Sequence, residues 1–195
     1  MNVHEIPCEQ CGTLTPSYDL VTTGSIATGY RQLCSACFNR EVAEMVGWEG
    51  FEHTRFAPVT LNDRQGAAHE FHFRSFLCGT GLVLEAFELV DGQPGGYHFS
   101  VLGDPEADPL ARLAQLIDKM RQALAVQHLN EDDYGLRIAD LCVRGRIECG
   151  EDGPGEPPCL VIDGRELTWD DFGRLLSSYE GWQFKLEIRD RTDEV

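Results

Sequence analysis

The chain has 195 residues, 42% of them hydrophobic and 25% charged, which fits one or two folded domains and argues against disorder. Its 33 acidic and 16 basic residues give a net charge of -17, which argues against a broad interface with nucleic-acid phosphates or anionic lipid. The N-terminus lacks a secretory signal, and no apolar stretch approaches the ~20 residues that cross a bilayer, so we expect a cytoplasmic protein with reduced thiols.

Four of the eight cysteines form two Cys-x-x-Cys pairs, and Gly12 follows the first pair. A two-residue gap lets one tight turn present two sulfurs to the same ion, and a glycine frees the backbone to bend beneath them. Zinc suits four thiolates because it accepts tetrahedral geometry. We therefore predict one structural Zn²⁺ with no open position for substrate or water. Its predicted ligands are Cys8, Cys11, Cys34 and Cys37. The competing interpretations are a redox dithiol and unrelated core cysteines.

Two β-prone segments, 13–21 and 28–33, lie between the cysteine pairs. The flexible stretch at 22–25 separates them and predicts the turn of a hairpin. A helix is predicted directly after the second pair, at 38–46. Its buried face is expected to comprise Phe38, Val42 and Met45 or Val46.

A knuckle, a hairpin and a cysteine pair on the first turn of a helix resemble a treble-clef zinc finger. The segment is similar to GATA-type fingers, whose second pair also follows a leucine, and to the N-terminal zinc module of the Clp unfoldase. The resemblance covers residues 1–50 and implies a treble-clef fold with the four cysteines as ligands.

Two activities of similar fingers are not expected here. GATA-type fingers bind DNA through a basic helix, whereas this helix offers Arg40 against three glutamates. HNH nucleases need histidines around a catalytic metal, and the segment contains only His4. The role of similar fingers that stays open for this segment is docking to another protein, as in the unfoldase module.

Short alternating segments from residue 51 onward predict an antiparallel meander. Strands are expected at 54–61, 69–77, 81–90 and 97–101, with a Gly- and Pro-rich turn at 91–96. Pro58 favours an edge position for the first strand. The side of 69–77 that faces the core is expected to carry Phe71, Phe73 and Leu77.

A helix is predicted to begin at Asp108-Pro109, which supply a cap and a first-turn proline. Apolar residues recur at spacings of three and four, and this stripe needs a sheet or another helix to cover it. The stripe comprises Leu110, Leu113, Ile117, Met120 and Leu124. Packing on the sheet is favoured over a coiled-coil dimer.

The last third of the sequence predicts a small ββαβ unit. An acidic linker or hinge is expected at 131–135, a strand or bent pair of strands at 137–148, and a loop at 150–158. A hairpin with an Asp-Gly turn is expected at 160–167.

A helix is predicted to follow that hairpin, with Thr168 and Asp171 as a capping box and Gly181 at its end. It should bury Phe172, Leu175, Leu176 and Tyr179. The alternating residues Phe184, Leu186 and Ile188 predict a closing strand. This tail resembles a module of uncharacterised bacterial proteins, a domain of unknown function, and that resemblance implies no activity.

The predicted fold class is therefore α+β. It comprises a zinc module at 1–50, an antiparallel sheet with a long helix at 51–130, and the C-terminal unit at 131–195. The last two units are either separate or packed as one domain.

Other candidate sites are weaker. Glu70 and His72 share a strand face that His98 could join across the sheet, whereas His69 points to the opposite face. Four further cysteines lack paired spacing and are expected to be buried: Cys78, Cys142, Cys149 and Cys159. Three tryptophans are expected to plug the core: Trp48, Trp169 and Trp182.

These patterns predict a non-enzymatic, zinc-stabilised protein that docks to another protein. A partner with a basic face would be attracted by its charge. Neither a membrane nor nucleic acid is expected as a partner. The first alternative is an enzyme with a pocket around Glu70, His72 and His98. The second is a nucleic-acid regulator built on the finger.

Overall fold

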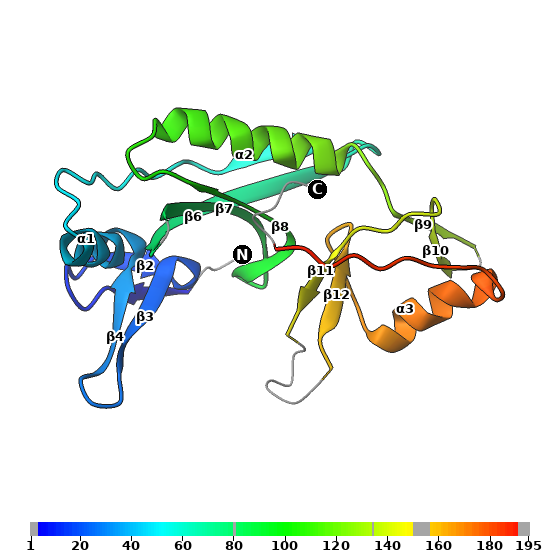
Figure 1. Ribbon diagram of the computed structural model, residues 1–195, viewed down its shortest axis with the longest axis horizontal. Helices are drawn as coiled ribbons and strands as arrows, with labels where there is room; N and C mark the ends of the chain where they lie inside the picture. The colour runs from blue at the N-terminus through cyan, green and yellow to red at the C-terminus, as the bar shows by residue number, and fades with distance from the viewer. Residues whose placement is uncertain (1–3, 80, 134, 150–156, 191–195) are drawn as a thin grey trace.

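The computed structural model describes residues 4–79, 81–133, 135–149 and 157–190. Its helices and antiparallel sheets give an α+β fold, as predicted. Three units follow one another along the long axis of the molecule (Figure 1). The cysteine-rich unit lies at one end, a four-stranded sheet with its helix lies in the middle, and the C-terminal unit lies at the other end.

The cysteine-rich unit contains two antiparallel pairs of strands, a one-turn 3-10 helix and one α-helix. These elements are β1 (Glu5–Pro7), β2 (Leu14–Pro16), the 3-10 helix (Ser17–Asp19), β3 (Leu20–Ser25), β4 (Gly29–Cys34) and α1 (Ser35–Val46). The β3–β4 hairpin projects from the body of the molecule (Figure 1).

The turn of this hairpin differs from the prediction. Residues 22–25 belong to β3, and the turn lies at 26–28. Gly24 makes the longer strand possible, because its φ is +127° and an added Cβ would lie 2.1 Å from the carbonyl oxygen of Gly29. The segment predicted as one strand at 13–21 is split by the 3-10 helix that follows Pro16.

The buried face of α1 is more polar than predicted. Phe38 and Val42 are half-buried, but Met45 and Val46 are 80% and 49% exposed. The residues buried instead belong to the cysteine cluster or contact the sheet. The buried residues of α1 are Ser35, Cys37, Asn39 and Ala43.

The middle unit is an antiparallel meander with one helix across it (Figure 1). In sheet order its strands are β5 (Val59–Asn62), β6 (Ala68–Cys78), β7 (Gly81–Val90) and β8 (Gln93–Gly103), and the helix is α2 (Pro109–Leu124). β5 lies at an edge, as predicted, but it begins after Pro58 and not at residue 54. β8 is longer than predicted because the turn needs only Asp91 and Gly92, both in the left-handed region.

The core of this unit confirms the inward positions of the predicted strand and corrects those of the helix. Phe71 and Leu77 are buried, and Phe73 packs against the core. On α2 the buried row recurs every four residues: Arg112, Leu116, Met120 and Leu124. Leu113 and Ile117 flank this row, but Leu110 is 66% exposed because it lies two positions, about 200°, from Arg112 around the helix.

The C-terminal unit has its own core and begins earlier than the predicted linker. Of the residues predicted as a linker or hinge, 131, 132 and 135 are instead paired in the β9–β10 hairpin, and Tyr134 lies outside the described residues. The strands and helix are β9 (Leu129–Asp132), β10 (Gly135–Ile138), β11 (Arg146–Glu148), β12 (Cys159–Ile162), β13 (Arg165–Leu167) and α3 (Trp169–Leu176), which is followed by a 3-10 turn (Ser177–Tyr179). The shared core comprises Leu129, Leu160, Ile162 and Leu167.

Local signals in this unit are confirmed. The turn between β12 and β13 is Asp163-Gly164, and the Thr168 hydroxyl accepts a hydrogen bond from the Asp171 amide at 3.1 Å. Phe172 and Leu175 pack against the core, whereas Leu176 is 43% exposed. Most of the loop predicted at 150–158 lies outside the described residues.

The predicted closing strand is wrong. Residues 182–190 follow an extended path (Figure 1) but belong to no sheet of the described structure. The apolar side chains of this segment are exposed: Trp182 by 62%, Phe184 by 91%, Leu186 by 68% and Ile188 by 73%.

Both flanking units attach to the middle sheet through its backbone edges. β5 pairs with β6 only as far as Phe71, and beyond it the side chain of Asn39 binds the edge that β5 leaves unpaired. Its Nδ2 donates to the Ser75 carbonyl at 2.9 Å, and its Oδ1 accepts from the Leu77 amide at 2.8 Å. The Asn39 amide therefore takes the place of the missing strand.

The other edge of the sheet, on β8, is bound by cationic side chains. Arg146 of β11 donates to the carbonyls of Gly96 and His98 at 3.1 and 3.3 Å. Lys119 of α2 donates to the next carbonyl on that edge, Ser100, at 3.2 Å. Arg146 thus ties the C-terminal unit to the sheet.

We expect Asn39→Ala to lower the free energy of unfolding by about 2–4 kcal/mol, because it leaves the Ser75 carbonyl and the Leu77 amide without their buried partner. Urea denaturation of the full chain measures this difference. Asn130→Ala is a matched control, since Asn130 is an exposed asparagine in β9. Equal stabilities of the two variants would contradict the assignment.

Candidate metal centre

The first cysteine pair lies on a tight turn between β1 and β2. The Gly12 amide donates to the Cys8 carbonyl at 2.8 Å, and the Cys8 amide donates to the Thr13 carbonyl at 2.9 Å. Gly12 has a φ of +72°, the left-handed conformation expected where the chain turns back. These bonds place both sulfurs on the same side of the turn.

The second pair lies where β4 ends and α1 begins. Cys34 is the N-cap residue of the helix, so Cys37 falls in its first turn. The Cys34 amide donates to the Cys8 sulfur at 3.2 Å and joins the two pairs. The side chain of Glu9 adds a second link, because it accepts from the Gln32 amide on β4 at 2.8 Å.

The four sulfurs fit one metal ion. They all lie within 4.8 Å of one another, and the Cys11 and Cys34 sulfurs are 3.9 Å apart. Zinc–sulfur bonds of about 2.3 Å in a tetrahedron give a sulfur–sulfur separation of about 3.8 Å. Three of the residues are 1–2% exposed, and only Cys11 is open to solvent. No other group of three or more metal-capable side chains comes this close among the described residues.

The surroundings affect the four thiols differently. Burial raises the pKa of Cys34 and of Cys37, and the neighbouring thiols raise that of Cys37 further. At Cys8 burial also raises the pKa, but backbone amide donors outweigh it and the net shift is downward. The Thr13 hydrogen bond lowers the pKa of Cys11 to about 6. A bound cation is the natural compensation for bringing four thiolates together.

An open pocket of about 160 Å³ is lined by residues of the cysteine-rich unit, of the segment after α1 and of the sheet. Its polar lining includes Asp19, Ser35 and His53. Burial raises the pKa of Asp19 and lowers the pKa of His53 to about 4, so the imidazole is neutral near pH 7.

The hydrogen bonds of His53 give it a structural role. The Asn39 Nδ2 lies 3.0 Å from Nδ1, which must accept because an amide nitrogen can only donate. The proton of a neutral ring is then on Nε2, which faces the Ser35 hydroxyl at 3.3 Å. A ring in this tautomer cannot act as a base toward Ser35, so the resemblance to a Ser–His pair carries no nucleophilic chemistry.

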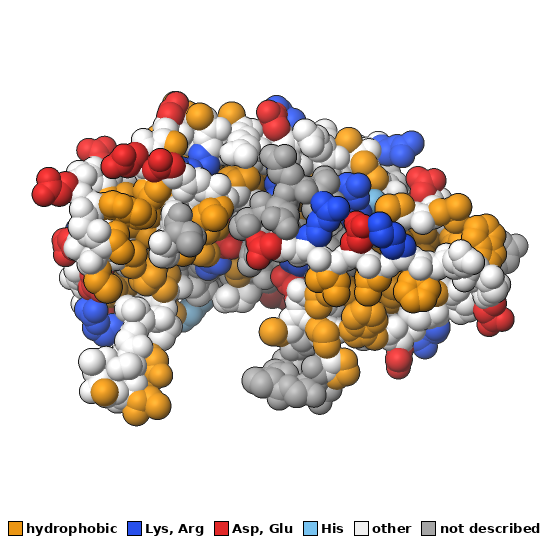
Figure 2. Space-filling view, viewed as in Figure 1, with side chains coloured by type: hydrophobic (Ala, Val, Ile, Leu, Met, Phe, Trp, Pro, Cys, Tyr) orange, Lys and Arg blue, Asp and Glu red, His pale blue; other side chains and the backbone are white. Residues whose placement is uncertain are grey.

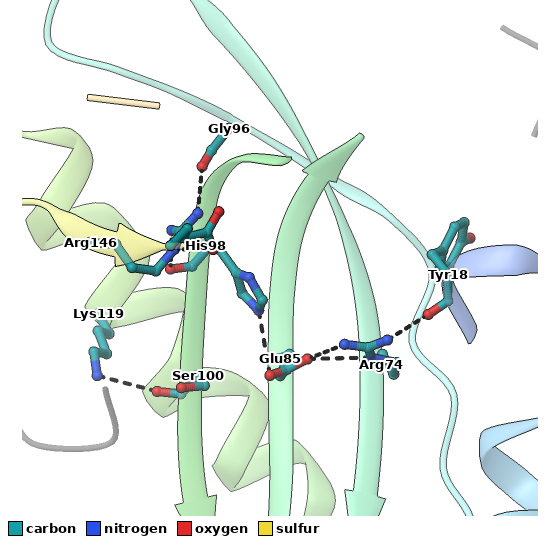
Figure 3. A network of polar contacts seen from close by, with 9 residues as sticks. Tyr18, Arg74, Glu85, Gly96, His98, Ser100, Lys119 and Arg146 are labelled. Atoms are coloured by element: carbon teal, nitrogen blue, oxygen red, sulfur yellow. Dashed lines mark hydrogen bonds and ion pairs between the residues drawn. The ribbon is translucent and has the colours of Figure 1, made fainter. Parts of the chain in front are cut away.

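The sheet face opposite α2 carries a row of charged side chains (Figure 3). The Glu85 carboxylate lies between Arg74, with Nη2 at 2.7 Å, and His98, with Nε2 at 3.5 Å. Arg74 also donates to the Tyr18 carbonyl at 2.8 Å and so connects the row to the cysteine-rich unit. Burial alone would raise the pKa of Glu85, but His98 and Arg74 outweigh it and hold the pKa at about 2.

Only two of the three polar residues proposed from sequence for an enzyme pocket come together. His72 lies 3.1 Å from Glu70, as their shared face predicted, but His98 pairs with Glu85 instead. The buried ring of Phe87 stands between the two histidines, because it is opposite both in the strand register. The structure therefore does not favour an active site around Glu70, His72 and His98. His69 has separate partners, with Nδ1 2.8 Å from Glu88.

Two groups of residues are less buried than predicted. Cys142 and Cys149 are exposed, and Cys78 and Cys159 are half-buried, so these four cysteines are not core residues. Trp48 packs against a small core between α1 and the sheet, but Trp169 and Trp182 are 42% and 62% exposed. The two tryptophans that were wrongly predicted to be buried both belong to the C-terminal unit. The predicted last strand of that unit does not form among the described residues.

Sequence reasoning missed the contacts that join the units, which are made by Asn39, Arg74 and Arg146, and it missed Glu85 as the buried partner of Arg74. For Asn39 a signal was present, since a polar residue on the inward side of a short helix needs a buried partner. Nothing in the sequence indicates that the partner is the edge of β6. The pairing of Arg74 with Glu85 could have been found from the register of the predicted hairpin.

Three family models match the chain, each over less than half of its length. All three describe a domain of unknown function: DUF7685 at residues 7–49, DUF7686 at 52–125 and DUF7713 at 128–193. No curated protein and no solved structure matches the chain. Among the described residues, no helix has the length and apolar character needed to cross a membrane.

We expect Cys37→Ser to abolish metal binding and to unfold the cysteine-rich unit, because so small a unit depends on the metal for most of its stability, on the order of 10 kcal/mol. Metal content of chelator-free protein and hydrogen exchange of the full chain measure the two effects. Residues 5–46 should lose protection while the sheet, which has its own core, keeps it. The exposed Cys142→Ser is the control. Stoichiometric metal in Cys37→Ser would contradict the site.

Glu85 should make the fold acid-sensitive. Its pKa falls from an ordinary 4.5 to about 2 on folding, so its contribution is complete above pH 4.5 and is lost as the pH falls toward 2. Glu85→Gln, which mimics the protonated acid, should be less stable than wild type by about 3 kcal/mol at pH 7. The difference should vanish near pH 2. Urea denaturation of wild type and Glu85→Gln between pH 2 and pH 7 measures this difference in stability. Glu70→Gln, at an exposed glutamate, is the control. A difference between wild type and Glu85→Gln that does not change with pH would contradict the prediction.

Proposed function

We propose that this protein is a zinc-stabilised interaction protein whose cysteine-rich unit is a treble-clef finger that docks to another protein. The single observation that supports it is the cluster of four sulfurs, held by a knuckle on one side and by the start of a helix on the other. With four protein ligands, zinc has no free position for substrate or activated water. The metal would therefore be structural and would hold the unit in shape.

The surface of this unit supports a docking role. Five large apolar side chains of the cysteine-rich unit are exposed: Leu14, Ile26, Tyr30, Met45 and Val46. Ile26, which is 95% exposed, occupies the turn of the β3–β4 hairpin, and Tyr30 lies opposite Gly24 near the tip. Figure 2 shows hydrophobic side chains gathered at the end of this projecting hairpin. Such side chains on a projecting element are typical of a contact surface.

Charge indicates the kind of partner. Residues 1–50 carry six acidic and two basic side chains, and the whole chain carries -17. A protein with an apolar cleft for the hairpin tip and a basic rim around that cleft matches both properties. The same charge opposes binding to nucleic acid.

A photoreactive amino acid at position 26 tests the proposal in native cells. We expect one discrete crosslinked product, formed with a protein whose contact surface is basic, and we expect the yield to fall with added salt because the rim contacts are screened. Cys8→Ser should abolish the product by releasing the metal. The same amino acid at Leu141, which is 76% exposed in the C-terminal unit, is the matched control. Equal products from both positions, or none from position 26, would refute the docking role.

A further inference from the structure

The extended segment after α3 presents two different sides. Apolar Phe184, Leu186 and Ile188 alternate with charged Lys185, Glu187 and Arg189. Along this segment, red in Figure 1, Figure 2 shows charged side chains on one side and hydrophobic side chains on the other. The three apolar side chains are 68–91% exposed. This is the side-chain pattern of a half-buried strand, in a segment that joins no sheet of the described residues.

We propose that residues 183–189 pair with the same residues of a second copy of the chain, as an antiparallel strand pair with its twofold axis at Leu186. This inference rests on the C-terminal unit and is independent of the metal site and the hairpin. In the resulting dimer each copy contributes the same surface, as a twofold interface requires.

The register follows from self-complementarity. With the axis at Leu186, Lys185 of each copy lies opposite Glu187 of the other, so two oppositely charged pairs form on one side of the ribbon. On the other side, Phe184 lies opposite Ile188 and the two Leu186 side chains meet. Six apolar side chains, three from each copy, then form one continuous surface.

Neighbouring registers do not combine oppositely charged pairs on one side with an all-apolar surface on the other. An axis at Lys185 places two lysines opposite each other, and an axis at Glu187 places Glu187 opposite Glu187 and Lys185 opposite Arg189. An axis between two residues would put apolar side chains opposite charged ones and break both faces. Of these registers, only the one centred on Leu186 avoids like charges and keeps the two faces apart.

The charge of the chain also favours this segment as the contact between copies. Two proteins of charge -17 repel each other over most of their surfaces. Residues 183–189 carry two basic side chains and one acidic side chain, so they form a locally cationic stretch of an acidic protein. Within each copy Glu187 already lies 2.5 Å from Lys185 and 3.3 Å from Arg189, which shows that these groups share a side.

Sedimentation velocity of the full chain over a concentration series is the first test. We expect a reversible dimer of twice the 21.8 kDa chain mass. Leu186→Lys should be monomeric at every concentration, because it removes the central apolar contact and places like charges on the axis. Ile26→Lys, at an equally apolar but distant exposed site, should dimerise like wild type. A monomeric wild type, or a dimeric Leu186→Lys, would overturn the proposal.

Charge exchange tests the register itself. Lys185→Glu places glutamates opposite Glu187, and Glu187→Lys places lysines opposite Lys185, so each variant alone should dimerise roughly tenfold or more weakly than wild type. A mixture of the two should form the heterodimer, because every cross-strand pair is then of opposite charge. Only pairing between chains predicts this recovery. If the mixture dimerises no better than its components, the register is wrong.

Discussion

Buried backbone groups at the two edges of the middle sheet determine how this molecule is assembled. A sheet edge inside a protein must find partners for its N–H and C=O groups. β6 extends past the end of β5, and the amide of Asn39 satisfies Ser75 and Leu77 there. On β8, Arg146 and Lys119 satisfy successive carbonyls. Both flanking units are therefore positioned by directional hydrogen bonds as well as by apolar contact.

The second cysteine pair and Asn39 belong to the same helix, and this joins the cysteine cluster to the sheet. α1 begins at the second cysteine pair and reaches Asn39 within its first turns. His53, in the segment that follows α1, lies within hydrogen-bonding distance of Asn39 and of Ser35 at the start of the helix. The helix is thus held at its start by the contact between Cys34 and the Cys8 sulfur, and further along by the hydrogen bonds of Asn39 to the edge of β6. The cysteine-rich unit is held at a defined orientation to the sheet.

Local signals in the sequence predicted local structure well. The bounds of β7, the start of α2 at Asp108-Pro109, the Asp163-Gly164 turn and the Thr168 cap follow from periodicity and from residues with restricted backbones. The cysteine spacing likewise predicted which four residues come together. Predictions failed where residues distant in sequence determine the structure. Which side of α2 is buried depends on the sheet that it packs against. The role of Asn39 depends on an unpaired strand edge that lies 36 residues later in the chain. The pattern of 184–188 predicted a strand whose partner the chain does not supply among its described residues.

The uneven exposure of the cysteine cluster has a chemical consequence. Three of the four cysteines are enclosed by the knuckle and the helix, whereas Cys11 is open to solvent. If the cluster holds an ion, competing chelators and peroxides would meet the Cys11 sulfur first. Its detachment would leave three sulfurs around the ion, which could then be either rebound or released. The rate of release would depend on how readily the Cys8–Gly12 turn opens.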